Sequence, residues 1–258
     1  MSPIPLEPEP AKPNLPGAVI VRPDPDQVLD ALGADLTVHA INCVRTFGDF
    51  HLALSGGSTP FPLYRRLMID PHYREFPWRR THLWIVDERK VPFDHEKSNW
   101  RQIDETIVQH SDIPPEQVHP MLATRDDADV LYEEALRQTL VWREKGQDRL
   151  DFVLLGMGGD GHTASLFPRS QALMEQKTSP RFVLNNRGPE VTPPDRVTMT
   201  FNLINAARFI AVLCVGEGKK SMLARVAAGT ESSDDLPILG VKPLAGELRW
   251  YLDHAACP

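Results

Sequence analysis

The sequence predicts an α/β fold, namely a doubly wound, mostly parallel, Rossmann-like sheet flanked by helices. The first observation behind this prediction is that short apolar runs of strand length alternate with segments of helical periodicity. The second is that three of the runs lead directly into glycine-rich turns, at residues 55–60, 156–161 and 216–219. Ligands of open α/β sheets bind beyond the carboxyl ends of the strands, so these turns predict where a binding site lies.

The spacing of the apolar residues predicts the helices and strands in chain order. Asp24 places a negative charge at the start of the first long helix, and Pro60 suits the first turn of the second. Residues 152–155 are apolar throughout, as in a strand buried on both faces. We expect strands at residues 18–21, 50–54, 81–86, 152–155, 181–184, 197–201, 209–215 and 248–252. We expect helices at residues 24–47, 60–68 and 126–142, and further helices that start near 98, 163 and 219.

Composition limits the class of protein. The 258 residues suffice for a sizeable core, and we expect one domain over residues 18–258. Residues 1–17 carry six prolines and are expected to form an extended or disordered tail, with a docked arm as the alternative. The net charge of −7 gives no support for nucleic-acid binding. No apolar run reaches the ~18 residues of a membrane span, so no membrane partner is expected.

The cysteines indicate the compartment. Cys43, Cys214 and Cys257 fit neither a zinc pattern nor a disulfide framework, so we expect a reducing cytoplasm. There is also no His-x-x-x-His pair, and we expect no metal and no cofactor. The sequence leaves the oligomeric state open, and a monomer is compatible with it.

The turn at residues 156–161 carries the strongest candidate for chemistry. His162 stands at its exit, and Asp160 lies two residues before it. A purely structural interpretation also fits, since glycines permit positive φ and close packing, while an aspartate can cap the following helix. In the catalytic interpretation, the imidazole acts at the carboxyl end of a buried strand.

Two other turns and nearby charges suggest a pocket for a phosphorylated small molecule. Backbone N–H groups and hydroxyls of a strand–loop–helix turn can face an anion, although a tight turn with a Ser/Thr cap is the alternative. The candidates in the first turn are Ser55, Gly56, Gly57, Ser58 and Thr59. The third turn carries Lys219 at a helix start, and the strand at 81–86 ends at Asp87 and Arg89. The proline-rich stretch 188–196 adds Arg196.

Several segments together resemble the 6-phosphogluconolactonase family. They are the runs L-S-G-G-S-T-P at 54–60, D-E-R at 87–89 with S-N at 98–99, G-M-G-G-D-G-H-T-A-S-L-F-P at 156–168, P-P-D-R at 193–196 and G-E-G-K at 216–219. The resemblance covers about residues 18–253. It implies hydrolysis of 6-phospho-D-glucono-1,5-lactone to 6-phosphogluconate in the oxidative pentose phosphate pathway, on a Rossmann-like sheet, with no metal or nucleotide.

Two alternatives compete with this interpretation. The related glucosamine-6-phosphate deaminase family has a glutamate five positions after the motif histidine, where this sequence has Phe167, which cannot exchange protons. A sugar-phosphate sensor domain without catalysis normally carries a DNA-binding helix-turn-helix, and the proline-rich segment at residues 1–17 is too short for one.

The implied reaction suggests roles for the candidate residues. A lactone is an activated ester, so a neutral imidazole of His162 can remove a proton from water as it attacks C1. Asp160 or Asp87 would fix the tautomer of that imidazole, and the sequence does not choose between them. Backbone N–H groups of the glycine turn, or an arginine, would stabilise the developing oxyanion. Candidates for the phosphate are the Ser55–Thr59 turn, Lys219 and Arg196, with Arg89 and Arg187 as weaker ones.

Overall fold

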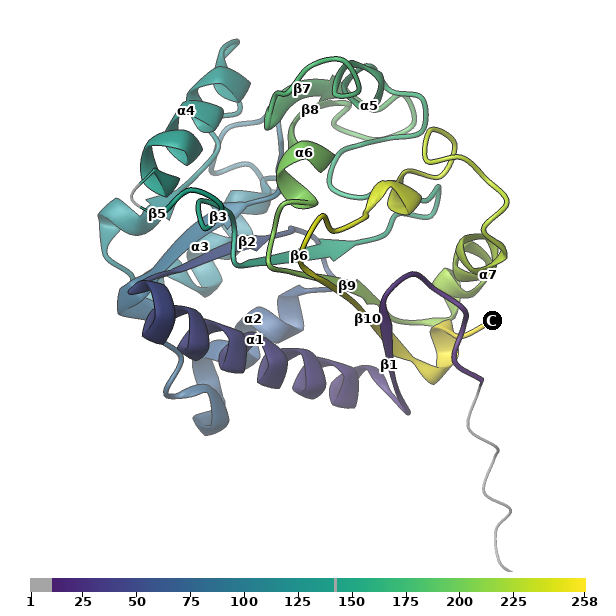
Figure 1. Cartoon of the computed structure of the whole chain (residues 1–258), viewed down its shortest axis with the longest axis horizontal. Coiled ribbons are helices and arrows are strands. Elements are labelled where there is room, and N and C mark those ends of the chain that lie inside the picture. Colours follow the sequence, from purple (N-terminus) through teal and green to yellow (C-terminus); the bar gives the residue numbers. More distant parts are fainter. Residues whose placement is uncertain (1–10, 142) are drawn as a thin grey trace, which may run out of the picture.

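The computed structural model describes residues 11–141 and 143–258. A seven-stranded sheet with parallel pairing throughout forms its centre, which confirms the predicted fold class (Figure 1). In spatial order its strands are β1 (Ala18–Arg22), β10 (Glu247–Asp253), β9 (Phe209–Cys214), β6 (Phe152–Gly156), β2 (Phe50–Leu54), β3 (Thr81–Ile85) and β5 (Val118–His119). Every residue of β2 and β9 is buried, as expected of strands covered on both faces.

The strand order creates one switch point, between β2 and β6. From β2 the chain continues outward through β3 to β5, and from β6 it continues in the opposite direction through β9 to β10. Connections that leave two neighbouring strands in opposite directions open a crevice at their carboxyl ends. The loop after β2 holds Ser55 and the loop after β6 holds His162, so the topology brings two of the predicted site segments together.

Helices cover the sheet on both sides (Figure 1). The longest, α1, buries an apolar stripe that includes Leu32 and Leu36, begins where the Asp24 carboxylate accepts from Gln27 N at 2.9 Å, and ends at Gly48 with φ of 92°. The α-helices are α1 (Pro25–Phe47), α2 (Phe61–Ile69), α3 (Asn99–Thr106), α4 (Ala128–Leu140), α5 (Gln171–Glu175), α6 (Phe201–Ile204) and α7 (Lys220–Ala228). None of the helices in the described ranges has the length and hydropathy needed to cross a membrane.

A second sheet, which the sequence did not indicate, lies on the side of the main sheet opposite α1 (Figure 1). It is antiparallel, in the order β4 (Asp87–Arg89), β8 (Asp195–Met199) and β7 (Val183–Arg187). The strands expected at 181–184 and 197–201 therefore belong to this sheet, with shifted bounds. The connection from β7 to β8 is short, which permits only antiparallel pairing. β4 follows β3 after one residue and carries two pocket candidates into this second layer.

The helix expected to start at residue 163 is absent from this described stretch. Residues 163–166 form a tight turn instead, closed by a bridge between Thr163 and Leu166, and α5 begins only at Gln171. Ala164 has φ of 50°, which a right-handed helix does not allow. Asp160 therefore caps no helix.

Part of the expected N-terminal tail packs against the domain. Leu15 is buried, and the indole N–H of Trp250 donates to the carbonyl of Pro16 at 2.8 Å. Residues 13–16 thus correspond to the docked-arm alternative rather than to a disordered tail. Residues 1–10, with their prolines, lie outside the described residues, as does Trp142, the end of the helix expected at 126–142.

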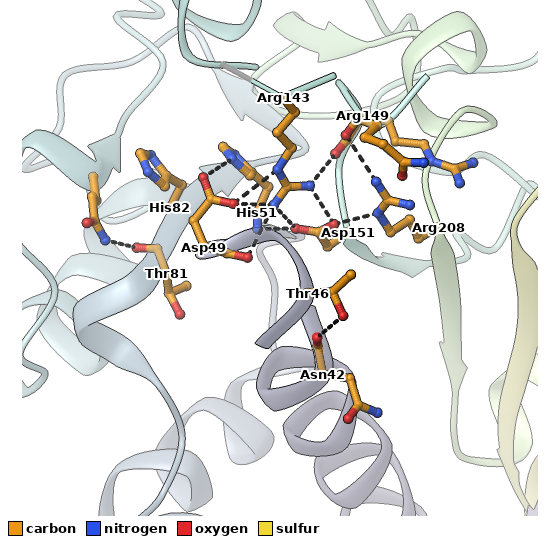
Figure 2. A network of polar contacts seen from close by, with 12 residues as sticks. Asn42, Thr46, Asp49, His51, Thr81, His82, Arg143, Arg149, Asp151 and Arg208 are labelled. Atoms are coloured by element: carbon orange, nitrogen blue, oxygen red, sulfur yellow. Dashed lines mark hydrogen bonds and ion pairs between the residues drawn. The ribbon is translucent and has the colours of Figure 1, made fainter. Parts of the chain in front are cut away.

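A buried polar network joins the strands at their amino-terminal ends, opposite the crevice (Figure 2). Its centre is Asp151, fully buried just before β6, whose carboxylate accepts from Arg143 Nη1 at 2.8 Å and from Arg143 Nη2 at 2.7 Å. It also accepts from Arg208 Nε at 2.8 Å and from His51 N at 2.7 Å. One carboxylate thus holds β2, β6 and the segment that leads into β9.

Candidate active site

The crevice at the β2–β6 switch point contains a cavity of about 170 Å³. Most residues predicted from the sequence line it, namely Ser55, Gly56, Gly57, Thr59, Asp87, Arg89, His162 and Lys219. Ser58 and Arg196 are outside the lining, and Asp160 lies behind His162. The loops after β2 and β6, strand β4 and the short turn Glu217–Lys219 after β9 therefore contribute to one pocket.

The glycine turn folds so that the His162 ring forms part of the wall. Gly158 N donates to His162 O at 2.8 Å, and Gly161 N donates to Gly158 O at 3.1 Å. Gly161 has φ of 82°, a conformation that favours glycine. A Cβ on Gly158 would lie 2.2 Å from the His162 ring, so only glycine leaves room for the imidazole. Since both N–H groups are used inside the turn, neither of them is free for an oxyanion.

Asp160 contacts the imidazole and Asp87 does not. The His162 Nδ1 lies 2.5 Å from Asp160 Oδ1, and His162 N also donates to that oxygen, at 3.1 Å. Burial acts to raise the pKa of Asp160, but hydrogen bonds and charge from His162 outweigh it, so the pKa lies below its usual value. An ionised Asp160 accepts a hydrogen bond from Nδ1–H, which leaves the Nε2 lone pair available. Asp87 Oδ2 instead accepts from Ser165 Oγ at 2.6 Å.

Phe167 packs against the histidine. The two ring centroids are 4.7 Å apart with an interplanar angle of 51°, and Phe167 is buried. The side chain next to the imidazole is thus apolar where a deaminase of the related family would place its carboxylate. No second acid is available at this position for relaying a proton.

The loop after β2 offers fewer free donors than the sequence suggested. Ser55 Oγ donates to Leu154 O at 2.7 Å and thereby ties β2 to β6. Gly57 N donates to Gln102 Oε1 at 3.2 Å. The hydroxyl of Ser55 is therefore a structural donor, and Thr59 is the hydroxyl of this loop that remains at the pocket wall.

Two of the four predicted cations reach the cavity. Lys219 Nζ donates to Met157 O at 2.6 Å, and Arg89 Nη1 donates to Lys97 O at 2.7 Å, so each keeps further donors for a ligand. Arg196 is buried on β8 with its guanidinium carbon 6.0 Å from the centre of the Phe167 ring. Arg187 is exposed and pairs with Asp195 at 2.7 Å. Arg89 and Lys219 are therefore the cations placed to meet an anionic ligand.

Sequence reasoning did not single out Asn99 and Ser165 as site residues. Asn99 lines the cavity and donates from Nδ2 to the Asp87 carbonyl at 2.9 Å, and Ser165 holds the Asp87 carboxylate. Both lie within or beside segments that carried the family resemblance, and that position was the available signal.

One group in the described ranges has metal-ligand residue types in proximity, and it lies at the other end of the strands. Donor atoms of Asp49, His51 and His82 all lie within 4.8 Å of one another. Trp84 Nε1 donates to His51 Nδ1 at 3.1 Å. An indole N–H only donates, so Nδ1 is unprotonated and Nε2 carries the proton, 3.3 Å from Asp49 Oδ2. A metal at Nε2 would displace that proton, so these residues fit a hydrogen-bonded cluster better than a metal site.

Together the fold and the pocket define a class of protein. A doubly wound sheet with a His–Asp pair and two cations at its switch point is the arrangement of an α/β enzyme for a small anionic ligand. Comparison with known proteins then gives the family. The chain belongs to the family described as glucosamine-6-phosphate isomerases/6-phosphogluconolactonase, whose model matches residues 23–250.

Individual relatives carry the lactonase name. The chain is 37% identical over 239 residues to a 6-phosphogluconolactonase of Nostoc sp., covering 90% of this chain and 94% of that protein. It is also 37% identical over 239 residues to the human GDH/6PGL endoplasmic bifunctional protein, of which it spans only 29% of the length. Among solved structures, the 6-phosphogluconolactonase of Trypanosoma brucei superposes with a TM-score of 0.77 at 26% identity, covering 94% of this chain and 98% of that one.

Proposed function

We propose that this chain hydrolyses 6-phospho-D-glucono-1,5-lactone to 6-phospho-D-gluconate, as a 6-phosphogluconolactonase of the oxidative pentose phosphate pathway. The observation that carries the proposal is the His162–Asp160 pair on the cavity wall, with Nδ1 engaged at 2.5 Å. Nostoc and Trypanosoma relatives named as 6-phosphogluconolactonases over nearly their whole length support the substrate.

The proposed mechanism needs one proton acceptor and no covalent intermediate. His162 Nε2 takes a proton from a water molecule as the water oxygen attacks C1 of the lactone. Asp160 keeps the second proton on Nδ1 and stabilises the imidazolium that forms. The C1–O bond of the ring then breaks, and the imidazolium returns its proton to the leaving ring oxygen. Arg89 and Lys219 supply the positive charge in the pocket for the substrate phosphate.

The test measures lactone consumption and ammonia release side by side. The lactone hydrolyses spontaneously. The purified chain must therefore raise the rate above that background by an amount proportional to enzyme concentration. Ammonia from glucosamine 6-phosphate distinguishes the second activity in the family description. Because Phe167 provides no carboxylate beside His162, we expect no ammonia release. Ammonia production at a rate comparable to lactone hydrolysis would reverse the assignment.

We expect the phosphate to select the substrate. Charge-assisted hydrogen bonds contribute on the order of 1.5–3 kcal/mol each. Replacing Lys219 or Arg89 with alanine should therefore raise KM for the phosphorylated lactone by roughly tenfold or more. The rate on unphosphorylated gluconolactone should change far less, because the lost partner was already absent there. Initial rates of both variants on both substrates check this. An equal loss on the two substrates would assign these residues to the fold or to the chemistry.

The pocket geometry changes the expectation for Arg196. Arg196 is buried and is not among the residues that line the cavity, so Arg196→Ala should lower the melting temperature more than it raises KM. Arg196 lies directly opposite Arg89 in the β4–β8 pairing, on the same face of this sheet, so the two variants compare a buried cation with a neighbouring one that lines the cavity.

The remaining parts of the proposal concern location and partners. We place the chain in the cytoplasm, because Cys43, Cys214 and Cys257 are all free and buried, as in a reducing compartment. Its partner is the small sugar-phosphate lactone, with neither nucleic acid nor membrane involved, and a monomer suffices for the pocket described above. Cell fractionation and sedimentation of the purified chain test these two points.

A further inference from the structure

The three residues of strand β4 alternate between the pocket and the domain interior. Side chains of a strand point to opposite faces in turn. Asp87 and Arg89 line the cavity, whereas Glu88 between them does not and is fully buried. A carboxylate is expensive to bury unless it is well hydrogen-bonded, so its presence between two pocket residues requires an explanation.

Glu88 accepts four hydrogen bonds. Its Oε1 accepts from Arg89 N and from Asn99 N, both at 2.8 Å. Its Oε2 accepts from Trp100 N at 2.7 Å and from Ser98 Oγ at 3.0 Å. Burial raises the pKa of Glu88, and these donors act against that rise. The two backbone donors at Oε1 and the one at Oε2 suit an ionised carboxylate at the positive end of α3.

A simple helix cap does not account for this arrangement. Helix α3 already has an N-cap, because Arg101 N donates to Ser98 Oγ at 3.1 Å. Glu88 comes from a different element and adds a connection between β4 and α3. A single atom, Oε1, holds the backbone of two pocket residues that lie on separate elements, Arg89 on β4 and Asn99 on α3.

The side chains of those two residues complete the connection. Asn99 Nδ2 donates to the carbonyl of Asp87 at 2.9 Å, so α3 also fixes the residue before Glu88. A Cβ on Gly56 would lie 2.0 Å from Asn99 Oδ1, which shows that Asn99 is in close contact with the loop after β2. Displacing Asn99 would therefore disturb both walls of the cavity on this side.

We propose that Glu88 is a positioning residue for the ligand-binding wall of the pocket, acting through Arg89 and Asn99. The proposal rests on the assignment of Arg89 to the substrate phosphate under the proposed function. Glu88 itself touches no substrate. It determines where the Arg89 guanidinium stands in the pocket, and so sets substrate affinity rather than the chemical step.

The discriminating variant is Glu88→Gln, which keeps the shape and removes two acceptor positions. In either orientation the amide NH2 faces backbone N–H groups, those of Arg89 and Asn99 or that of Trp100. We expect KM for the phosphorylated lactone to rise roughly tenfold with kcat within about twofold. Glu105→Gln is the matched control, because Glu105 lies on α3, the helix that Glu88 contacts, is exposed and has only its pair with Arg101 to lose. It should leave KM unchanged.

A double-mutant cycle separates positioning from general destabilisation. In an Arg89→Ala background, Glu88→Gln should raise KM by less than about twofold, because the side chain that it positions is gone. If Glu88→Gln folds poorly, Ser98→Ala is the second variant. It removes one donor to the carboxylate together with the N-cap of α3, and it should give a smaller KM rise with the same dependence on Arg89.

The outcomes that overturn the proposal differ from those that overturn the function. An equal KM factor in both backgrounds, or a fall in kcat at constant KM, excludes positioning through Arg89 while the lactonase activity stands. A wild-type chain without enzyme-dependent lactone hydrolysis overturns the proposed function itself. An Arg89→Ala variant with normal KM removes the phosphate role of Arg89 and the role of Glu88 together.

Discussion

Replacing His162 with asparagine should lower kcat by roughly 10²–10⁴-fold, the usual contribution of a general base. Asparagine fits the space beside Gly158 and can still donate to Asp160, but it has no basic nitrogen to take the proton of water. KM should change little, because Arg89 and Lys219, the two cations that line the pocket, stay in place. Steady-state kinetics, corrected for the spontaneous reaction, measure both parameters.

The control for this variant is His110→Asn, which makes the same substitution at an exposed histidine away from the pocket. Its kcat should equal that of the wild type. A His162→Asn variant that retains near-normal kcat while folded, as judged by circular dichroism, would remove the imidazole from the mechanism.

Replacing Asp151 with asparagine should lower the stability of the fold more than any of the other substitutions described above. The substitution leaves Arg143 and Arg208 with no anionic partner in this network except Asp49, which pairs with Arg143. Breaking a buried ion pair from one side costs about 3–5 kcal/mol, because a charge remains buried without compensation. For a domain of this size we expect the melting temperature to fall on the order of 10 °C.

The comparison for this effect is Asp127→Asn. Asp127 also pairs with an arginine, Arg125 at 2.8 Å, but both side chains are about half exposed. Exposed ion pairs contribute little, so the melting temperature should hardly change. If the two variants melt alike, the network in Figure 2 contributes no more than a surface pair.

Strands β2, β6 and β9 of the main sheet were predictable because nearly all of their residues are buried, whereas the two-residue, partly exposed β5 was not expected from the sequence. Continuous apolar runs such as the one in β6 and glycines directly after them are local signals, and the parallel order follows from helices between strands. The second sheet was not predictable from the same signals. Its strands carry polar residues such as Asn185 and Thr198, and their pairing is decided by the path of the chain between them.

The candidate site was predictable as a set of loops but not as a set of contacts. The sequence identified the turns that carry His162 and Lys219, because glycines after strands are visible locally. It left Asp160 and Asp87 as equal partners of the imidazole, since only the fold decides that Asp87 meets Ser165 instead. The prediction of a helix after the turn was wrong for a similar reason, because no local sequence signal indicates the positive φ of Ala164.

The rings of His82, Trp84 and His119 pack together at the ends of the strands opposite the pocket, and they affect the stability of the protein in acid. His82 Nδ1 lies 3.0 Å from His119 Nε2, and the His119 ring stacks on Trp84 at 3.7 Å. Burial, together with neighbouring histidines, lowers the pKa of His82 to about 4 and the pKa of His119 to about 3. Asp49 and Asp151 act against the shift at His82, whereas Arg143 and His51 add to it.

The direction of the pH effect follows from these lowered values. Unfolded histidines titrate near 6.5, so above that pH both states are neutral and the full stability is present. As the pH falls from about 6.5 towards 4, the unfolded chain binds protons that the folded chain does not, and stability is lost. The double variant His82→Phe/His119→Phe keeps the rings but cannot titrate, so its melting temperature should fall less steeply over this range. Parallel curves for the two proteins would contradict this.

Acid should therefore open this protein locally before it unfolds globally. His119 belongs to β5, a two-residue strand at the sheet edge that pairs only with β3 among the described strands. Short edge elements open at low free-energy cost. In mild acid we expect amide hydrogen exchange to accelerate first in β5 and the adjoining part of β3, while β6 and β9 under the pocket stay protected. The pocket would then keep its shape at a pH at which the far edge of the sheet is already exchanging with solvent.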